Sequence, residues 1–235
     1  MPVEILQPCR IICEGAADAA FFNALIKSHG ITNCEADCAR TDNDSKRCAG
    51  KNGVTDTLRS LRGFSDIHPD KLKGVIVAVD TDLNWEKALR ETIRSIHAVE
   101  PPISCPERFL EITKEKKKGD FFVSILGIPW HDELGNLDSL LFKSMEATHA
   151  DIIAPLETFC DATRLRNGDW DIGRKSKMKL RCTIASSYKD DPGISLGYLL
   201  SRKVHPIDLR HEAFSRIVDF LKRFVREADR PVGAI

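Results

Sequence analysis

Two carboxylates directly follow an apolar run in the first half of the chain. Small and β-branched apolar residues extend from Gly74 to Val79, and Asp80 and Asp82 come at the end of this run. Such a run predicts a strand buried on both faces, as in a parallel sheet covered by helices. Ligands of open α/β sheets bind outside the carboxyl ends of the strands, so chemistry is expected here. Two anionic oxygen ligands held together favour Mg²⁺ or Mn²⁺ between them.

A second acidic position occurs near the start of the chain. The segment 9–15 predicts a short buried strand that ends in Glu14 and a glycine, and the apolar pattern after it predicts a helix. Asp18 lies one helical turn after Glu14, close enough to share a site or to stabilise the helix start. The two strand ends together would deliver three carboxylates, Glu14 and the pair at 80 and 82, to one rim of the sheet.

Each acid also has a purely structural interpretation. Asp82 can cap a helix that begins near Asn84, and Asp80 can be a solvated turn residue. Asp138 lies in the first turn of a helix predicted over 136–145, where the helix dipole favours an acid. The functional interpretation therefore depends on whether the strand ends lie side by side.

The arrangement of these acids resembles the Toprim domain, the topoisomerase–primase metal-binding module that also occurs in nucleases of the overcoming-lysogenization-defect (OLD) family. The resemblance is carried by Glu14-Gly15-x-x-Asp18 after the first strand and by Asp80-x-Asp82 after a later strand. It implies an α/β fold that is Toprim-like (Rossmann-like), with a mostly parallel sheet flanked by helices.

Two further stretches are similar to Toprim-like families of unknown function that are related to OLD. The stretch 127–141 resembles their strand, Pro-turn and helix, and the stretch 177–197 resembles their tail. The last acid of those families is commonly Glu, for which Asp138 is a shorter substitute. The position after their first Glu-Gly is often Lys, whereas Ala16 stands here. Any role of that lysine is therefore filled elsewhere or is absent.

The carboxylates and the resemblance together predict metal-dependent phosphodiester chemistry. Two divalent ions about 4 Å apart lower the pKa of an attacking water and neutralise a leaving alkoxide. Mg²⁺ or Mn²⁺ would be held by five acids, namely Glu14, Asp18, Asp80, Asp82 and Asp138. Asp80 and Asp82 are also expected to be catalytic residues. Glu14 would act as a ligand or as general base and acid, a role that the resemblance also implies.

Basic residues supply candidate partners for a phosphate backbone. The segment from Arg164 to Arg181 holds seven basic residues and two acids. It contacts phosphates if it faces the carboxylates, and it is only a helix surface if it faces solvent. Lys177 and Lys179 are the candidates for stabilising the negative charge of the transition state, and they are chosen partly by the resemblance. Of the two, Lys179 is expected to be the catalytic residue. Lys51 lies between glycines and either touches a phosphate or belongs to a solvated turn, because the P-loop spacing is missing.

Composition limits the class of protein. The chain has 235 residues, of which 42% are apolar, and its 35 basic and 35 acidic side chains argue against a strongly basic, non-specific nucleic-acid binder. No apolar run approaches the roughly 20 residues that span a bilayer, and a signal-peptide pattern is missing. We therefore expect a cytoplasmic protein without membrane contact. Its eight cysteines are expected to be reduced thiols, with a zinc site at Cys34, Cys38 and Cys48 as the alternative.

Two regions are predicted. Residues 1–150 form a Toprim-like metal-binding α/β core, and residues 151–235 form a helical extension packed on that core. The polar stretch 40–53 is predicted to be a mobile loop. The patterns further predict helices over 16–28, 54–61, 85–98, 136–145, 152–165, 175–188, 196–200 and 209–226, and strands over 108–112 and 121–128 joined by a lysine-rich hairpin.

Two functions remain open. The first is a two-metal, Toprim-type nuclease that acts on DNA or RNA. The second is a non-catalytic Toprim-like module that binds nucleic acid, a nucleotide or a partner protein such as a separate ATPase. The four acids at 14, 18, 80 and 82 favour the first function, whereas Ala16 and Asp138 favour the second. A topoisomerase is disfavoured because both tyrosines, Tyr188 and Tyr198, lie in the helical tail.

Overall fold

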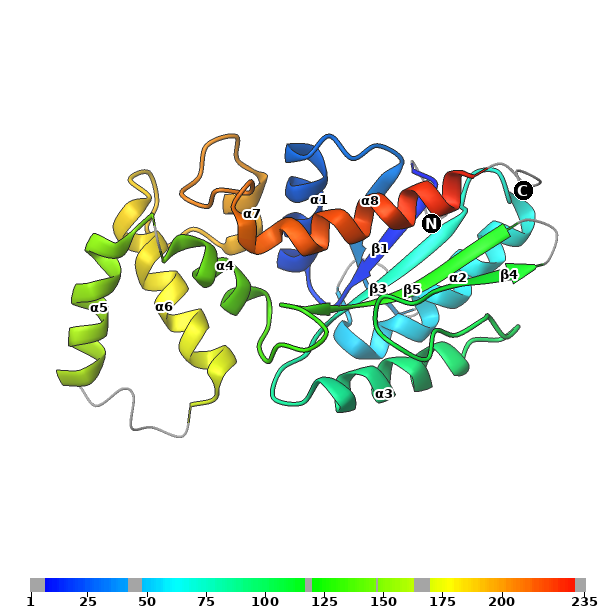
Figure 1. The fold of residues 1–235 in the computed structure, drawn as a ribbon, viewed down its shortest axis with the longest axis horizontal. Helices are drawn as coiled ribbons and strands as arrows, with labels where there is room; N and C mark the ends of the chain where they lie inside the picture. The colour runs from blue at the N-terminus through cyan, green and yellow to red at the C-terminus, as the bar shows by residue number, and fades with distance from the viewer. Residues whose placement is uncertain (1–6, 42–47, 117–119, 147, 163–169, 231–235) are drawn as a thin grey trace.

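The structure is a computed structural model that describes residues 7–41, 48–116, 120–146, 148–162 and 170–230 (Figure 1). The strands are β1 (Cys9–Cys13), β2 (Cys34–Cys38), β3 (Gly74–Asp80), β4 (Ile112–Lys116) and β5 (Asp120–Ile128). The α-helices are α1 (Ala16–Ser28), α2 (Val54–Ile67), α3 (Trp85–His97), α4 (Leu137–Met145), α5 (Ala150–Ala162), α6 (Ile172–Ser187), α7 (Leu196–Ser201) and α8 (Ser215–Asp229). Two short 3₁₀ helices are η1 (Gly50–Gly53) and η3 (Glu212–Phe214).

A five-stranded sheet forms the centre of the fold, in the order β2-β1-β3-β5-β4. The first four of these strands run parallel, and β4 is antiparallel to β5 at the edge. β1 and β3 are buried along almost their whole length, because helices cover both faces of the sheet. The predicted mostly parallel α/β sheet flanked by helices is thus confirmed.

The direction of chain progression reverses at β1. The chain leaves β1 through α1 to reach β2 on one side, and then returns through α2 to β3 on the other side. A crevice forms outside the carboxyl ends of the strands at such a switch point. Glu14 follows β1 and Asp80 ends β3, so the fold places both acids at this crevice.

Two hydrophobic clusters cover the two faces of the sheet. One cluster contains residues of α1, α4, α6, α7 and α8, with Phe21, Phe214 and Phe224 fully buried. The other contains residues of α2 and α3, including Leu58 and Ile96. α8 runs along the sheet, whereas α5 and α6 stand beyond its end (Figure 1). The helices after residue 150 therefore have two roles. Residues of α6, α7 and α8 belong to the hydrophobic core, and α5 and α6 extend the molecule beyond the end of the sheet.

Some element boundaries differ from the predicted ones. α2 continues to Ile67, six residues beyond its predicted end at 61. The first strand of the hairpin is Ile112–Lys116 rather than 108–112, so the predicted strand is wrong except at its last residue. Leu110 has a left-handed backbone with φ of 63°, which interrupts an extended strand before Ile112. α6 begins at Ile172 rather than 175, because the Asp171 side chain caps it by accepting a hydrogen bond from the Arg174 backbone. α8 begins at Ser215 rather than 209, after η3.

Cys38 and Cys48 form a disulfide, so the prediction of reduced thiols is wrong for this pair. The Ala49 N–H donates to the Ala39 carbonyl at 2.8 Å, which holds the two stretches together. Their Cα atoms are 5.5 Å apart, within the range that a disulfide spans. The disulfide also uses two sulfurs of the alternative zinc site.

Parts of four predicted features lie outside the described residues: 42–47 of the polar loop, 117–119 of the hairpin, 163–165 of the helix predicted over 152–165, and 164–169 of the basic segment. Among the residues that are described, no helix is both long enough and apolar enough to cross a membrane.

Candidate functional site: a carboxylate cluster at the crevice

Glu14 lies directly after β1 and faces two groups from distant parts of the chain. Its Oε1 is 3.4 Å from the backbone N of Asp80 and 3.7 Å from Nζ of Lys51. Burial raises the pKa of Glu14 to about 7, against the lowering effect of the Lys51 charge, and the charges of Asp82 and Asp18 raise it further. A carboxyl group with this pKa can exchange a proton at neutral pH.

Asp80 links the end of β3 to the start of α4. Its Oδ1 accepts a hydrogen bond from the backbone N–H of Leu137, the first residue of α4, at 3.2 Å. Burial raises the pKa of Asp80 to about 8, and the charges of Asp18, Glu14 and Asp82 add to this effect. These electrostatic effects mean that four carboxylates share one crevice.

The turn after β3 holds Asp82 in an uncommon backbone conformation. Asp82 has φ of 47°, and its backbone N–H and carbonyl pair with Gly135 at 2.7 and 2.8 Å. The buried Thr81 hydroxyl lies within hydrogen-bonding distance of carbonyls at the end of β5 and in the loop after it, including Ile128 at 2.9 Å. The side chain that caps α3 is Asn84, whose Oδ1 accepts from the Lys87 N–H. Asp82 is therefore not the cap, and its Oδ2 lies 3.4 Å from Nζ of Lys51.

Asp18 and Asp138 form the side of the cluster nearest α6. Asp18 Oδ2 accepts from the Gly15 N–H at 2.8 Å, and burial, opposed by this hydrogen bond, raises its pKa to about 6, with the Asp138 charge adding to the rise. Burial also raises the pKa of Asp138, against the charges of Lys177 and Arg181. Asp138 Oδ1 is buried without a hydrogen-bond partner among the described residues. A buried acceptor of this kind calls for a water or an ion.

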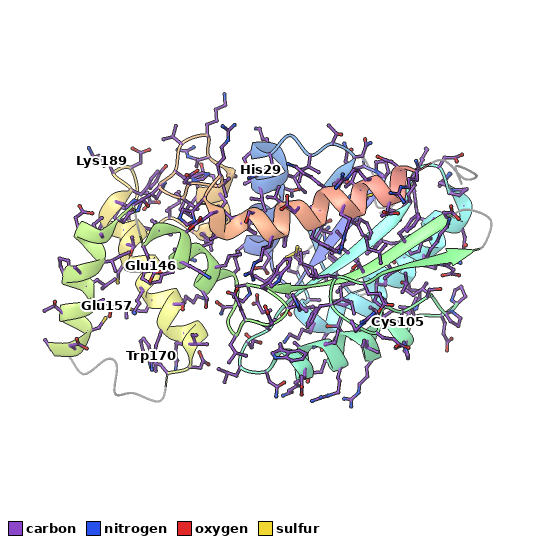
Figure 2. The ribbon with its side chains drawn as sticks, viewed as in Figure 1. His29, Cys105, Glu146, Glu157, Trp170 and Lys189 are labelled. Carbon is purple, nitrogen blue, oxygen red and sulfur yellow. A yellow bond between two sulfur atoms is a disulfide. The ribbon has the colours of Figure 1, made fainter. Side chains whose placement is uncertain are left out.

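The structure separates the two lysines proposed as charge partners. The positive charge of Lys177 lowers the pKa values of Asp18 and Asp138, against the effect of burial. Lys179 instead forms an ion pair with Glu157 of α5, which is labelled in Figure 2, and its Nζ lies 5.5 Å from the centre of the Phe142 ring. The reason is helical geometry, because residues two apart point to nearly opposite sides of a helix. Arg181 lies one turn after Lys177 and therefore shares its face.

The crevice opens into a cavity of about 660 Å³. Four elements form its walls: η1, the turn after β3 with the start of α3, the start of α4, and the start of α6. The lining residues are Lys51, Thr81, Asp82, Leu83, Asn84, Lys87, Ala88, Glu91, Asn136, Asp138, Asp171, Ile172, Gly173, Arg174 and Lys177. Asp82, Asp138 and Lys177 were predicted as site residues, Lys51 as a possible phosphate contact, and the start of α6 belongs to the basic segment 164–181. The lining residues of α3 carry no sequence motif that marks them.

The five acids fit a hard divalent cation by their chemistry. Across the described ranges, no three His, Cys, Asp or Glu side chains converge closely enough to hold a metal ion as they stand. Glu14, Asp18 and Asp80 accept backbone hydrogen bonds instead, and Lys51 lies between Glu14 and Asp82. A bound cation would relieve the repulsion that helps to raise the pKa values of Glu14, Asp18 and Asp80, and it would give Asp138 Oδ1 a partner.

Comparison with known proteins gives one family. No curated protein and no solved structure matches the chain. The profile of a family described as proteins of unknown function, DUF3226, matches residues 8–226. This stretch contains the whole sheet, all five acids of the cluster and the helices through most of α8. The chain therefore belongs to the DUF3226 family.

Proposed function

We propose that the protein is a Toprim-like, metal-dependent nuclease that hydrolyses phosphodiester bonds of DNA or RNA with Mg²⁺ or Mn²⁺. The observation that carries this proposal is the cluster of five carboxylates at the switch point of the sheet. Burial raises the pKa values of Glu14, Asp18, Asp80 and Asp138, and the charges of neighbouring acids add to the rise in the first three. Such a cluster is unfavourable without cations. The resemblance of Glu14-Gly15-x-x-Asp18 and Asp80-x-Asp82 to the Toprim metal site supports the same assignment.

The residues have distinct roles in this proposal. The five acids would hold the ions, which when bound would supply a water of lowered pKa and stabilisation of negative charge. Glu14, with a pKa of about 7, is suited to accept a proton and return it at neutral pH. Lys177 and Arg181 place positive charge beside Asp138 and are better placed than Lys179 to stabilise a phosphoryl group.

Lys51 supplies the positive charge that Ala16 lacks. Its Nζ reaches both Glu14 and Asp82, although it comes from η1, far along the chain. In the metal-free protein Lys51 partly neutralises the two acids. When cations are bound, we assign it to a non-bridging phosphate oxygen of the substrate.

Cleavage assays test the proposal. Plasmid DNA and a long RNA are incubated with the protein in Mg²⁺, Mn²⁺ or chelator. We expect metal-dependent cleavage that falls by roughly two or more orders of magnitude in Asp80→Asn, because a ligand is lost. Lys177→Gln should lower the rate more than Lys179→Gln. Asp219→Asn, an exposed acid on α8, is the control and should cleave like the wild type. Cleavage that survives Asp80→Asn contradicts the proposal.

One observation favours a second function, a non-catalytic module that binds nucleic acid, a nucleotide or a partner protein. As described, the acids are not arranged as a ready metal shell. Binding of nucleic acid without any cleavage in Mg²⁺ or Mn²⁺ would support this second function over the first.

A further inference from the structure

The cavity beside the carboxylates has room for part of a substrate. Its volume of about 660 Å³ lies in the range of small-molecule sites, roughly 300–1,000 Å³. Two metal ions with their waters occupy far less, since one water takes up about 30 Å³. From the lining of this cavity we infer that it takes an unpaired strand of nucleic acid rather than a duplex. This inference rests on the proposed function and names its substrate class.

The wall formed by α6 carries positive charge, and the ring of Trp170, which lies just before α6 and outside the lining, contacts Arg174 of that wall. Arg174 and Lys177 line the cavity opposite Asp82. The Arg174 guanidinium lies 5.2 Å from the centre of the Trp170 ring, which restricts both side chains. Figure 2 shows Trp170 at the start of α6. Two cations and a ring on one short stretch combine phosphate binding with a stacking surface, which is how proteins bind single strands.

Apolar side chains are exposed at the mouth of the cavity. Leu83 is 60% exposed and Ile172 is 44% exposed, and both line it from opposite walls. Trp85, the first residue of α3, directly follows the lining residue Asn84 and is 37% exposed. Large apolar side chains left in solvent beside a charged site indicate a ligand with apolar faces. Unpaired bases present such faces, whereas bases in a duplex are stacked inside it.

Close packing holds the α6 wall against α4. A Cβ atom on Gly173 would lie 2.6 Å from Nδ2 of Asn136, so a larger residue here would displace the Asn136 side chain. Asn136 in turn caps α4 by accepting a hydrogen bond from the Ser139 N–H. The charged and apolar groups are therefore fixed relative to the carboxylates before any ligand binds, which favours binding without a rearrangement of the walls.

The charge of the chain also favours a short unpaired segment. The chain is neutral overall, with 35 basic and 35 acidic residues. Duplex binding by shape and backbone needs many phosphate contacts. Four basic residues line the cavity, of which Lys87 pairs with Glu91, so that Lys51, Arg174 and Lys177 offer three phosphate contacts. With three phosphates neutralised, the logarithm of the binding constant should fall against the logarithm of salt concentration with a slope of about −2 for a single strand.

Fluorescence anisotropy tests this inference. A labelled mixed-sequence oligonucleotide, single-stranded or annealed to its complement, is titrated with the full chain in Ca²⁺, which binds carboxylates, and in chelator. We expect the single strand to bind at least about tenfold more tightly than the duplex. Trp170→Ala should weaken single-strand binding at least about fivefold, the lower end of base–aromatic stacking. Arg174→Gln should weaken it and make the salt slope shallower by about 0.7.

Controls separate the possible outcomes. Lys222→Gln, an exposed cation on α8, should leave binding unchanged, and circular dichroism checks that each variant folds. Equal or tighter binding of the duplex overturns the inference and leaves metal-dependent cleavage of duplex DNA possible. A mononucleotide that competes as well as the strand also overturns it. Selective single-strand binding without cleavage supports the inference and rejects the nuclease, so the two failures are distinguishable.

Discussion

Four carboxylates of the cluster have a hydrogen-bond or ion-pair partner, namely Glu14, Asp18, Asp80 and Asp82, yet the set is electrostatically unfavourable. Asp18 accepts the Gly15 N–H and Asp80 accepts the Leu137 N–H, so these two acids stabilise the starts of α1 and α4. These hydrogen bonds lower the pKa of the acids that accept them, but burial and repulsion outweigh the lowering. A single residue can therefore be structurally useful while the cluster as a whole favours a bound cation.

The first prediction concerns Asp80→Asn. The asparagine Oδ1 can still accept from the Leu137 N–H, whereas one of the mutually repelling charges is removed. We expect the metal-free variant to be more stable than the wild type at pH 8, by about 1.4 kcal/mol or more, the equivalent of one pKa unit. Mn²⁺ should then raise the melting temperature of the wild type more than that of the variant. Equal shifts with Mn²⁺ would show that Asp80 is not a ligand.

The second prediction concerns pH. The folded-state pKa values of Glu14, Asp18 and Asp80 are about 7, 6 and 8, above their ordinary values of 4.5, 3.8 and 3.8. At pH values between the ordinary and the folded-state pKa values, the folded chain therefore binds more protons than the unfolded chain. The free energy of unfolding then falls as pH rises. Urea unfolding in chelator should give a free energy of unfolding that decreases from pH 5 to pH 8. Asp80→Asn should make the free energy of unfolding depend less steeply on pH. A wild-type free energy of unfolding that rises from pH 5 to pH 8 would contradict the prediction.

At the scale of elements, the start of α6 decides what lies opposite the carboxylates. Asp171 caps the helix, which fixes where its first turn begins. Lys177 and Arg181 then face the cluster, and Lys179 faces α5. One residue of difference in the helix start would rotate all of these side chains by about 100°. The packing of Gly173 against Asn136 keeps this turn in place.

The third prediction compares two glycines. Gly173→Ala should push α6 from α4 and cost about 1–3 kcal/mol of stability, as overpacking does. Single-strand binding should weaken with it. Gly63→Ala is the matched control, because Gly63 lies inside α2 with open space around the added methyl. This second change should stabilise the protein by roughly 0.5–1 kcal/mol. Chemical unfolding of both variants measures the difference, and equal effects would exclude the close approach of α6 and α4.

At the scale of the whole molecule, the region after residue 150 contributes to the core of the region before it. The Phe224 ring of α8 lies so close to β3 that a Cβ on Gly74 would come within 2.9 Å of it. Phe214 packs against Phe21 of α1, with ring centres 5.4 Å apart. These contacts make the stability of the sheet depend on the last helix, and we expect the molecule to unfold in one transition.

The fourth prediction tests this dependence with Phe224→Ala. Removing a fully buried ring should cost about 3–5 kcal/mol and lower the melting temperature of the whole protein. Circular dichroism and tryptophan fluorescence should still report one coincident transition. Val204→Ala, at a side chain that is 80% exposed, should change stability by less than about 0.5 kcal/mol. A variant in which only α8 loosens while the sheet melts as before would argue for independent regions.

The sequence by itself determined the local elements that carry the chemistry. The helix 16–28 begins and ends as predicted, and the apolar run at 74–79 forms β3 with Asp80 at its carboxyl end. These features depend on hydrophobic periodicity and on residues that follow one another in the chain. Parallel strands then place acids that follow them at one edge, so the approach of Glu14 and Asp80 could be predicted from two short motifs.

Only the tertiary structure decided which distant residues join these acids. Lys51 reaches Glu14 through a turn that no apolar pattern marks, and Cys48 pairs with Cys38 because a backbone hydrogen bond holds their segments together. The choice of Lys177 over Lys179 depends on where α6 begins and how it packs on α4. Contacts of this kind arise from packing between segments far apart in the chain, and local spacing along the sequence carries no information about them.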